Sequence, residues 1–147
     1  MRGALASKSN QIIKACFNMV HTAKCLCGNI EIEARGNPNY AEYCHCIMCQ
    51  KSSGSSFMVW VVFDKENVSV TKGVISKFQS SPELQRGFCA NCGSNVSIHT
   101  EECFDLPIGA LENPDAIEIN QHIWAKRALK HVSLDDDLPK FDEGAPS

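Results

Sequence analysis

The sequence predicts a mainly β, single-domain protein that is held together at clusters of cysteine. Three observations lead to this fold class. The length of 147 residues suits one domain. Several short segments alternate polar and apolar residues as half-buried strands do. Seven of the nine cysteines fall into three tight clusters, which can cross-link distant segments through bound metal.

Strand patterns follow one another along the chain. Residues 29–34 alternate polar and apolar side chains, and residues 94–99 do so again. Residues 57–63 form a continuous apolar and aromatic run, which predicts a central strand. Residues 67–71 and 74–78 flank a Lys-Gly pair and therefore predict a hairpin.

Helix signals are weak, and the two ends differ from the core. Residues 82–85 and 113–116 each predict a single helical turn. The first eighteen residues carry basic but no acidic side chains, which indicates an added sequence, an upstream extension or an organelle-targeting segment. The acidic run at residues 135–144 predicts a solvated tail.

Composition excludes several classes of function. A formal charge of −3 without a lysine-arginine run argues against nucleic-acid binding. No apolar stretch reaches the roughly 18 residues that span a membrane, and the start of the chain lacks the pattern of a secretory signal. We therefore expect a cytoplasmic protein with no nucleic-acid and no membrane partner. In that compartment, clustered cysteines favour metal binding over disulfide pairing.

The spacing of the cysteines suits metal binding because each cluster brings thiols to one side of the chain. Cys25 and Cys27 are separated by one residue, as are Cys44 and Cys46, so each pair points to one face of extended backbone. Cys-x-x-Cys segments converge through a tight turn, and they occur at residues 46–49 and 89–92. Three such clusters in a short chain are a strong signal for metal binding.

Seven clustered thiols divide into four plus three. The thiols of Cys44, Cys46 and Cys49 lie within six residues and can hold one ion together. A second ion is then shared by the remaining four, which are Cys25, Cys27, Cys89 and Cys92. Four thiolates fill a tetrahedral zinc site and predict a structural role, whereas three leave one position for water or substrate. Thiolates favour zinc over magnesium or calcium, with iron as the alternative metal.

A second structural site is the alternative interpretation of the three-cysteine group. Its fourth ligand would come from His45, Cys103, Cys16 or His99. The side chain of His45 is nearest, but in extended backbone it points away from the flanking cysteines. A lone cysteine is more often a small buried apolar side chain than a ligand. We therefore favour an open group, on the ligand count that separates catalytic from structural zinc.

The order of the motifs resembles that of a known family. Cys-x-Cys-Gly at 25–28 precedes Cys-His-Cys-x-x-Cys at 44–49, which leads into Lys-Ser-Ser-Gly-Ser-Ser-Phe at 51–57, and Phe-Cys-x-x-Cys-Gly-Ser follows at 88–94. This order resembles the glutathione-dependent formaldehyde-activating enzyme family, which also includes centromere protein V. The resemblance continues through residues 113–115, 122–124 and 136–139. It divides the chain into an extension at 1–20, a domain at 21–143 and a tail at 144–147.

The resemblance implies a mainly β fold of short antiparallel sheets that binds two zinc ions. The structural zinc would be held by Cys25, Cys27, Cys89 and Cys92, and the catalytic zinc by Cys44, Cys46 and Cys49. The implied activity is that of a zinc-dependent carbon-sulfur lyase, which combines glutathione and formaldehyde to S-hydroxymethylglutathione. Lys51 is the candidate contact for a glutathione carboxylate, and a solvated surface lysine is the alternative.

Two residues depart from the family pattern. Gln50 stands where many members have arginine, and His131 stands where an aromatic residue, usually tryptophan, precedes the acidic segment. Two other functions therefore remain as alternatives: an enzyme of the same fold acting on another small electrophile or thiol conjugate, and a non-catalytic module with two structural zincs. Phe57, Trp60 and the segment 122–124 are expected to pack rather than to take part in chemistry.

Overall fold

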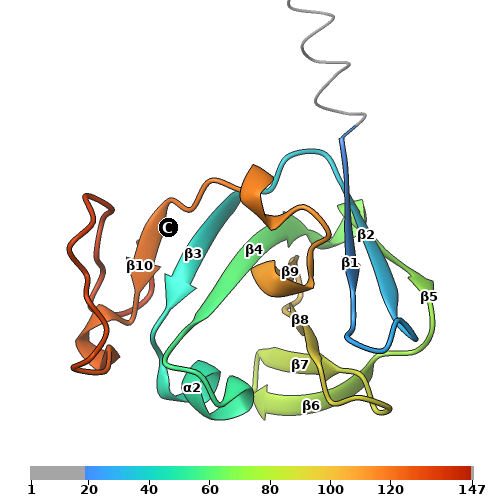
Figure 1. Ribbon diagram of the computed structural model, residues 1–147, viewed down its shortest axis with the longest axis horizontal. Coiled ribbons are helices and arrows are strands. Elements are labelled where there is room, and N and C mark those ends of the chain that lie inside the picture. Colours follow the sequence, from blue (N-terminus) through green and yellow to red (C-terminus); the bar gives the residue numbers. More distant parts are fainter. Residues whose placement is uncertain (1–18, 147) are drawn as a thin grey trace, which may run out of the picture.

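Two β-sheets face each other across the core of the computed structural model, which describes residues 19–146 (Figure 1). The smaller sheet has the order β1-β2-β5, and the larger has the order β10-β3-β4-β9-β8-β7-β6. Neighbouring strands are antiparallel, except that β10 runs parallel to β3. The strands are β1 (Val20–Lys24), β2 (Glu31–Arg35), β3 (Tyr40–Cys44), β4 (Met58–Asp64), β5 (Val68–Lys72), β6 (Ser76–Ser81), β7 (Leu84–Phe88), β8 (Asn95–His99), β9 (Cys103–Pro107) and β10 (Gln121–Ile123).

Helical structure within residues 19–146 is limited to one short α-helix and four 3-10 turns. The α-helix is α2 (Ile47–Ser53). The 3-10 turns are η1 (Lys65–Asn67), η2 (Ile108–Ala110), η3 (Pro114–Ala116) and η4 (Ala125–Arg127). This content confirms the mainly β class, and η3 confirms the turn predicted near residue 114. No helix of the described segment is both long and apolar enough to cross a membrane.

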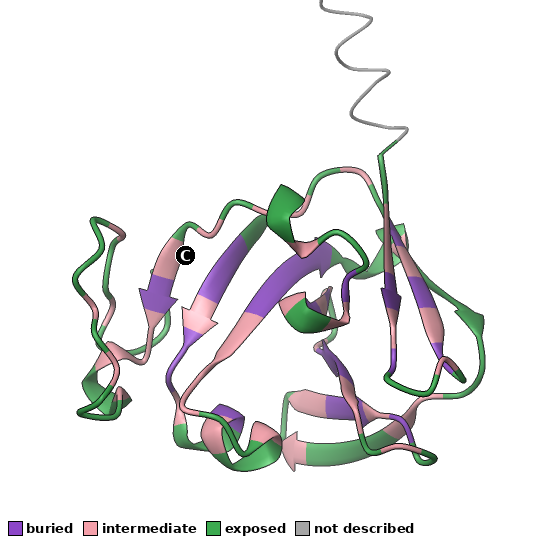
Figure 2. Ribbon diagram, viewed as in Figure 1, coloured by how far each residue is buried: buried purple, intermediate pink, exposed green. Residues whose placement is uncertain are grey.

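Alternating side chains of both sheets build the main core. Ile32 and Ala34 of β2 belong to the same apolar cluster as Val61 and Phe63 of β4 and Leu106 of β9. All five are at most 1% exposed, and burial of a large apolar side chain contributes about 1.5–3 kcal/mol. Figure 2 shows the buried segments of β2, β3 and β4 in purple. The alternation predicted at 29–34 and the central strand predicted at 57–63 are thus confirmed.

A second apolar cluster lies at the end of the larger sheet, next to α2. It contains Trp60 of β4 and Ile98 of β8 together with the thiols of Cys44 and Cys49. Arg86 lies opposite Ile98 across the β7–β8 pair, so the two side chains share one face of the sheet. This cluster brings strands from distant parts of the sequence to one group of cysteines.

The hairpin predicted over residues 67–78 is wrong. β5 pairs with β2 in the smaller sheet, whereas β6 pairs with β7 in the larger one. Gly73 carries the chain between the sheets with a φ of 76°, and an added Cβ would lie 2.1 Å from the carbonyl oxygen of Asn29. The Lys-Gly pair therefore marks a crossover that only glycine can pass at this closeness to the backbone.

The helical turn predicted at residues 82–85 is also wrong. Pro82 and Glu83 form the tip of the β6–β7 hairpin, and Leu84 already pairs with Ser81. Polar residues and proline suit a hairpin tip as well as a helix start, so the local signal was ambiguous.

The acidic C-terminal run is anchored rather than free. Its carboxylates at residues 135–137 are exposed, but its backbone lies along β10. The amide of His122 donates to the carbonyl of Pro139 at 2.8 Å, and the amide of Phe141 donates to the carbonyl of His122 at 2.9 Å. Residues 136–143 are thus largely solvated as expected, but the expectation of a free tail is wrong, because β10 offers unpaired backbone groups that bind them.

Candidate metal centres

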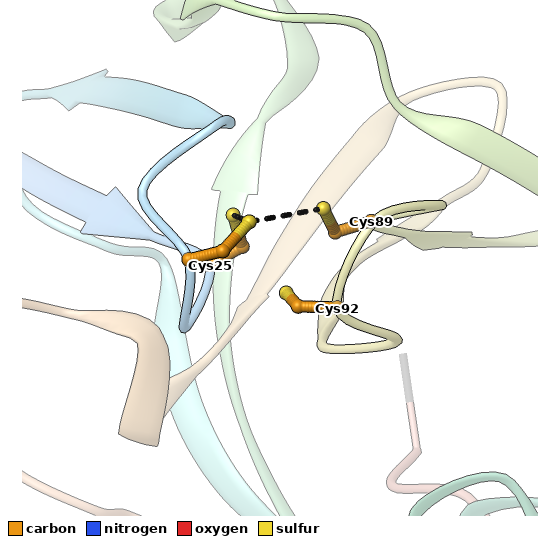
Figure 3. Close-up of side chains that lie close together, drawn as sticks. Cys25, Cys89 and Cys92 are labelled. Atoms are coloured by element: carbon orange, nitrogen blue, oxygen red, sulfur yellow. Dashed lines mark hydrogen bonds between the residues drawn. The ribbon is translucent and has the colours of Figure 1, made fainter.

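Four thiols converge where the turn after β1 meets the turn after β7. The Sγ atoms of Cys25, Cys27, Cys89 and Cys92 all lie within 4.8 Å of one another. Figure 3 shows Cys25 on one turn facing Cys89 and Cys92 on the other. Residues more than sixty positions apart are thereby joined, which removes much of the conformational freedom of the unfolded chain.

Each of the two turns is shaped by its own backbone. Gly28 and Gly93 follow the cysteines with φ values of 73° and 76°, a conformation that glycine adopts without strain. The amide of Gly28 donates to the carbonyl of Cys25 at 3.0 Å, and the amide of Gly93 donates to the carbonyl of Cys89 at 2.8 Å. Short turns of this kind direct their thiols toward one point.

The donors around the four sulfurs suit thiolates. The amide of Ile30 donates to Cys25 Sγ at 3.2 Å. The hydroxyl of Ser94 lies 3.2 Å from Cys92 Sγ, and its hydrogen bond is the main cause that lowers the pKa of Cys92 to about 5. Sulfur pairs 3.6 and 3.7 Å apart match the ~3.8 Å edge of a tetrahedron with zinc–sulfur bonds of about 2.3 Å. The residues therefore fit a tetrahedral zinc ion.

The three remaining clustered thiols meet between β3 and α2. Cys44 ends β3, Cys46 is the N-cap of α2, and Cys49 lies in its first turn. Their Sγ atoms also lie within 4.8 Å of one another. Cys46 Sγ accepts the amide of Cys49 at 3.3 Å, so the capping bond itself aims two thiols at the same point.

The closeness of the three thiols favours a negative charge on one of them. Hydrogen bonding from Cys44, followed by that from Cys49, lowers the pKa of Cys46 to about 2. Contact with Cys46, followed by that with Cys49, raises the pKa of Cys44. The group is therefore prepared to hold a cation even before all three thiols lose their protons.

Two side chains from other strands approach the sulfur of Cys49. The indole Nε1 of Trp60 donates to Cys49 Sγ at 3.3 Å. The guanidinium Nη2 of Arg86 lies 3.7 Å from the same sulfur, and its Nη1 donates to the hydroxyl of Ser52 at 3.2 Å. Arg86 is only 6% exposed. Trp60 is buried as predicted, but it also contacts the cysteine group.

His45 lies between two of the cysteines but faces away from their sulfurs. Its Nε2 is 2.9 Å from Nδ1 of His122, whose Nε2 is 2.8 Å from a carboxylate oxygen of Asp136. His45 is fully buried, and burial followed by the charge of His122 lowers its pKa. It is therefore a neutral link between the cysteine loop and β10, in agreement with the predicted orientation. His122 packs the returning segment, also as predicted.

The other residues singled out in the sequence lie outside both groups. Lys51 is exposed on α2 and makes no hydrogen bond or ion pair with the part of the chain that the structure describes. Gln50 donates to the carbonyls of His45 at 2.7 Å and Arg127 at 3.0 Å, and His131 is hydrogen-bonded to Ser56. Cys103 and His99 belong to neither metal-ligand group. Cys16 lies outside the described residues, as do positions 1–18 of the predicted extension.

The three-cysteine group reaches the surface on the side of α2. Cys46 is half-buried, and next to it Ile47 and Met48 are 47% and 43% exposed. A cavity of about 460 Å³ lies between the two cysteine groups: it is lined by Met58, which pairs with Cys44, and by Leu26 and Ser94 beside the four-cysteine group, but by none of the three cysteines. Partial exposure of Cys46 is the route by which a small molecule can approach this group.

Sequence reasoning did not identify Arg86 and gave Trp60 only a packing role. The incorrect helical turn at 82–85 concealed β7, on which Arg86 lies. The sequence signal was an arginine in the short segment Leu84–Phe88, which leads directly into Cys89. A charged side chain in an interior strand calls for a buried partner.

Comparisons with known proteins agree with this architecture. A family model described as "Glutathione-dependent formaldehyde-activating enzyme" matches residues 20–127. An uncharacterized lyase of Schizosaccharomyces pombe is 33% identical over 76 residues, which are 52% of this chain and 55% of that protein. A protein of Fusarium vanettenii, provisionally named a glutathione-dependent formaldehyde-activating enzyme, is 35% identical over 75 residues, which are 50% of this chain and 40% of that protein. The chain thus spans about half the length of the curated relatives it matches.

A solved structure supports the fold. The crystal structure of a Rhodobacter sphaeroides protein matches with a TM-score of 0.53 and 16% identity. The match covers 82% of this chain and 98% of that chain. At this identity the likeness concerns the fold alone.

Proposed function

Because the chain belongs to the glutathione-dependent formaldehyde-activating enzyme family, we propose that it is a zinc-dependent carbon-sulfur lyase. Its substrates would be a thiol such as glutathione and a small aldehyde such as formaldehyde, or the adduct of the two. The single observation that carries this proposal is the difference between the two cysteine groups. One gathers four sulfurs, enough to fill a tetrahedral zinc ion, and the other gathers three.

The proposed ligands follow from these groups. Cys25, Cys27, Cys89 and Cys92 would hold a structural zinc, and Cys44, Cys46 and Cys49 would hold the catalytic one. Three protein ligands are the usual number in catalytic zinc sites. Zinc in the second group would lower the pKa of an incoming thiol and make its sulfur nucleophilic at neutral pH.

The chain's own residues would position the reactants. In the forward direction the thiol sulfur forms a bond to the carbonyl carbon, and the thiol proton ends on the carbonyl oxygen; the reverse reaction breaks the same bond. Trp60 and Arg86 fix the sulfur of Cys49, which keeps the three ligands in place. Lys51, free of partners in residues 19–146 and two residues after Cys49, is proposed to pair with a glutathione carboxylate.

Metal analysis tests the open site. We expect two zinc ions per chain, of which mild chelation removes one while the fold persists, because four thiolates hold zinc in a closed shell and three do not. Loss of glutathione binding should accompany loss of that zinc. Two equally inert ions would instead support a module with two structural zincs.

The reaction itself can be followed by NMR exchange between formaldehyde and its glutathione adduct. Added protein should accelerate this exchange, and the protein without its labile zinc should not. Cys103→Ser is a matched control, since this thiol lies outside both groups and its loss should leave the acceleration intact. Exchange at the buffer rate with both zincs bound would contradict formaldehyde as substrate.

A second candidate is an enzyme of the same fold that acts on another electrophile or thiol conjugate. The observation in its favour is Gln50, which replaces the arginine common in the family and uses its amide to bind two carbonyls. A site without that cation recognises its substrate with less positive charge. The same NMR assay with other aldehydes and other thiols distinguishes the two candidates.

A further inference from the structure

The guanidinium of Arg86 is buried without a carboxylate partner. It is 6% exposed, and no carboxylate of residues 19–146 lies within ion-pair distance of it. A buried charge is costly unless an opposite charge lies close to it. The group that approaches it is the sulfur of Cys49, 3.7 Å from Nη2, which carries a negative charge when it binds a metal ion as a thiolate.

The remaining contacts hold this guanidinium toward the cysteine group. Its Nη1 donates to Ser52 on α2 at 3.2 Å, while Nε is buried and has no partner among the described residues. β7 lies between β6 and β8 in the sheet, so the backbone of Arg86 is fixed on both sides. Arginine is the cation best suited to such a buried position, because its charge is delocalised and it does not lose its proton.

Among residues 19–146, no cationic side chain is hydrogen-bonded to the sulfurs of the four-cysteine group. Its sulfurs receive the amide of Ile30 and contact the hydroxyl of Ser94. The nearby amines are used elsewhere: Lys72 donates to the carbonyl of Gly28, and Lys24 pairs with Glu112. The guanidinium of Arg86 therefore distinguishes the surroundings of the three-cysteine group from those of the four-cysteine group.

The formal charges at the three-cysteine group indicate the role of this guanidinium. Three thiolates and a divalent ion leave one negative charge, which repels a further thiolate. The guanidinium of Arg86 offsets this charge. Resting on the proposed function of the three-cysteine group, we infer that Arg86 is a specificity-determining residue: its charge makes the open group favour an anionic thiolate over a neutral ligand in the remaining position. At this depth, a unit charge a few ångströms away changes affinity by roughly tenfold or more.

Cobalt substitution gives a readout that is independent of catalysis. Protein loaded with Co²⁺ is titrated with 2-mercaptoethanol, which is bound as a thiolate but has no other charge, and separately with imidazole as a neutral ligand. Visible absorption reports both, since a thiolate adds a sulfur-to-cobalt charge-transfer band. For Arg86→Met we expect the affinity for the thiol to fall roughly tenfold or more while that for imidazole changes less than about twofold. Arg86→Lys should recover most of the thiol affinity.

Matched variants separate charge from structure. Arg35→Met removes an exposed arginine that pairs with Glu33 and should leave both affinities unchanged. If Arg86→Met does not fold, Arg86→Gln replaces it, because glutamine can still reach Ser52 without the charge. Equal affinities in wild type and the neutral variant, or an equal loss for thiol and imidazole, would overturn the role of Arg86. Absence of cobalt or of thiol binding in the wild type would instead contradict the proposed function.

Discussion

The two cysteine groups differ in how their surroundings are built. The four-cysteine group is completed by two turns and receives its donors from those turns and from residues next to them. The three-cysteine group comes from one continuous loop, but its surroundings come from β4, β7, β10 and the C-terminal segment. The four-cysteine group thus takes its hydrogen bonds from the turns that carry its ligands, whereas the three-cysteine group is surrounded by side chains that the whole fold supplies.

Loss of one ligand from each group is the strongest way to break this comparison. Cys92→Ser should cost roughly 5 kcal/mol or more and leave the domain largely unfolded, because the two joined turns are then held by three thiols only. Cys46→Ser should lose the labile zinc and cost no more than about 2 kcal/mol, since its loop is also held by α2 and β3. Urea unfolding and zinc content measure both effects. Equal destabilisation by the two variants would refute separate roles for the groups.

The strands and the cysteine groups could be predicted from the sequence where they depend on short spacing and on alternation of polar and apolar residues. The segments predicted at 29–34, 57–63 and 94–99 correspond to β2, β4 and β8, and the seven thiols gather as four and three, because both patterns repeat within a few residues. The partners of β5 and β6 could not be predicted, since the crossover at Gly73 is set by contact with Asn29. Arg86 was missed for the same reason, as its partner lies 37 positions away.

Asp105 on β9 makes its own pH-dependent contribution to stability. This contribution has to be separated from that of the cysteine groups. Burial, followed by the charge of Glu42, raises the pKa of Asp105 to about 7, and its Oδ1 has no partner within the described part of the chain. The folded state thus binds an extra proton between about pH 4 and pH 7, so stability from this group falls as pH rises through that window. Metal release from thiolates destabilises in the opposite direction, as pH falls.

Asp105→Asn should therefore stabilise the protein at pH 8 by about 4 kcal/mol and have little effect near pH 4. The free energy of unfolding, measured by urea at several pH values, checks this. Thermal melts with and without chelator then show the acid transition that belongs to the cysteine groups alone. A gain that is the same at pH 4 and pH 8 would contradict ionisation as its cause.

The hydrogen bonds from His45 to His122 and from His122 to Asp136 allow a test of whether distant segments support only the three-cysteine group. His122→Phe keeps an aromatic ring against Tyr43, whose ring centroid lies 4.5 Å away, but it leaves Nε2 of the buried His45 without its partner. An unpaired buried polar group costs about 2 kcal/mol. We expect faster chelation of the labile zinc and no change at the other site. Asp136→Asn should act in the same direction with a smaller effect, and loss of both zincs at equal rates would contradict the separation.

Two serine variants give the smallest and most local comparison. Ser94 accepts the amide of Leu26 at 3.0 Å and lies beside Cys92, while Ser53 donates to the carbonyl of Cys49 at 2.7 Å. Loss of such a hydrogen bond costs about 1 kcal/mol. Ser94→Ala should speed zinc loss from the four-cysteine group only, and Ser53→Ala from the three-cysteine group only, as measured by chelator-detected release in two phases. If either variant changes both phases, the surroundings of the two groups are coupled through the fold, because neither hydroxyl contacts the other group directly.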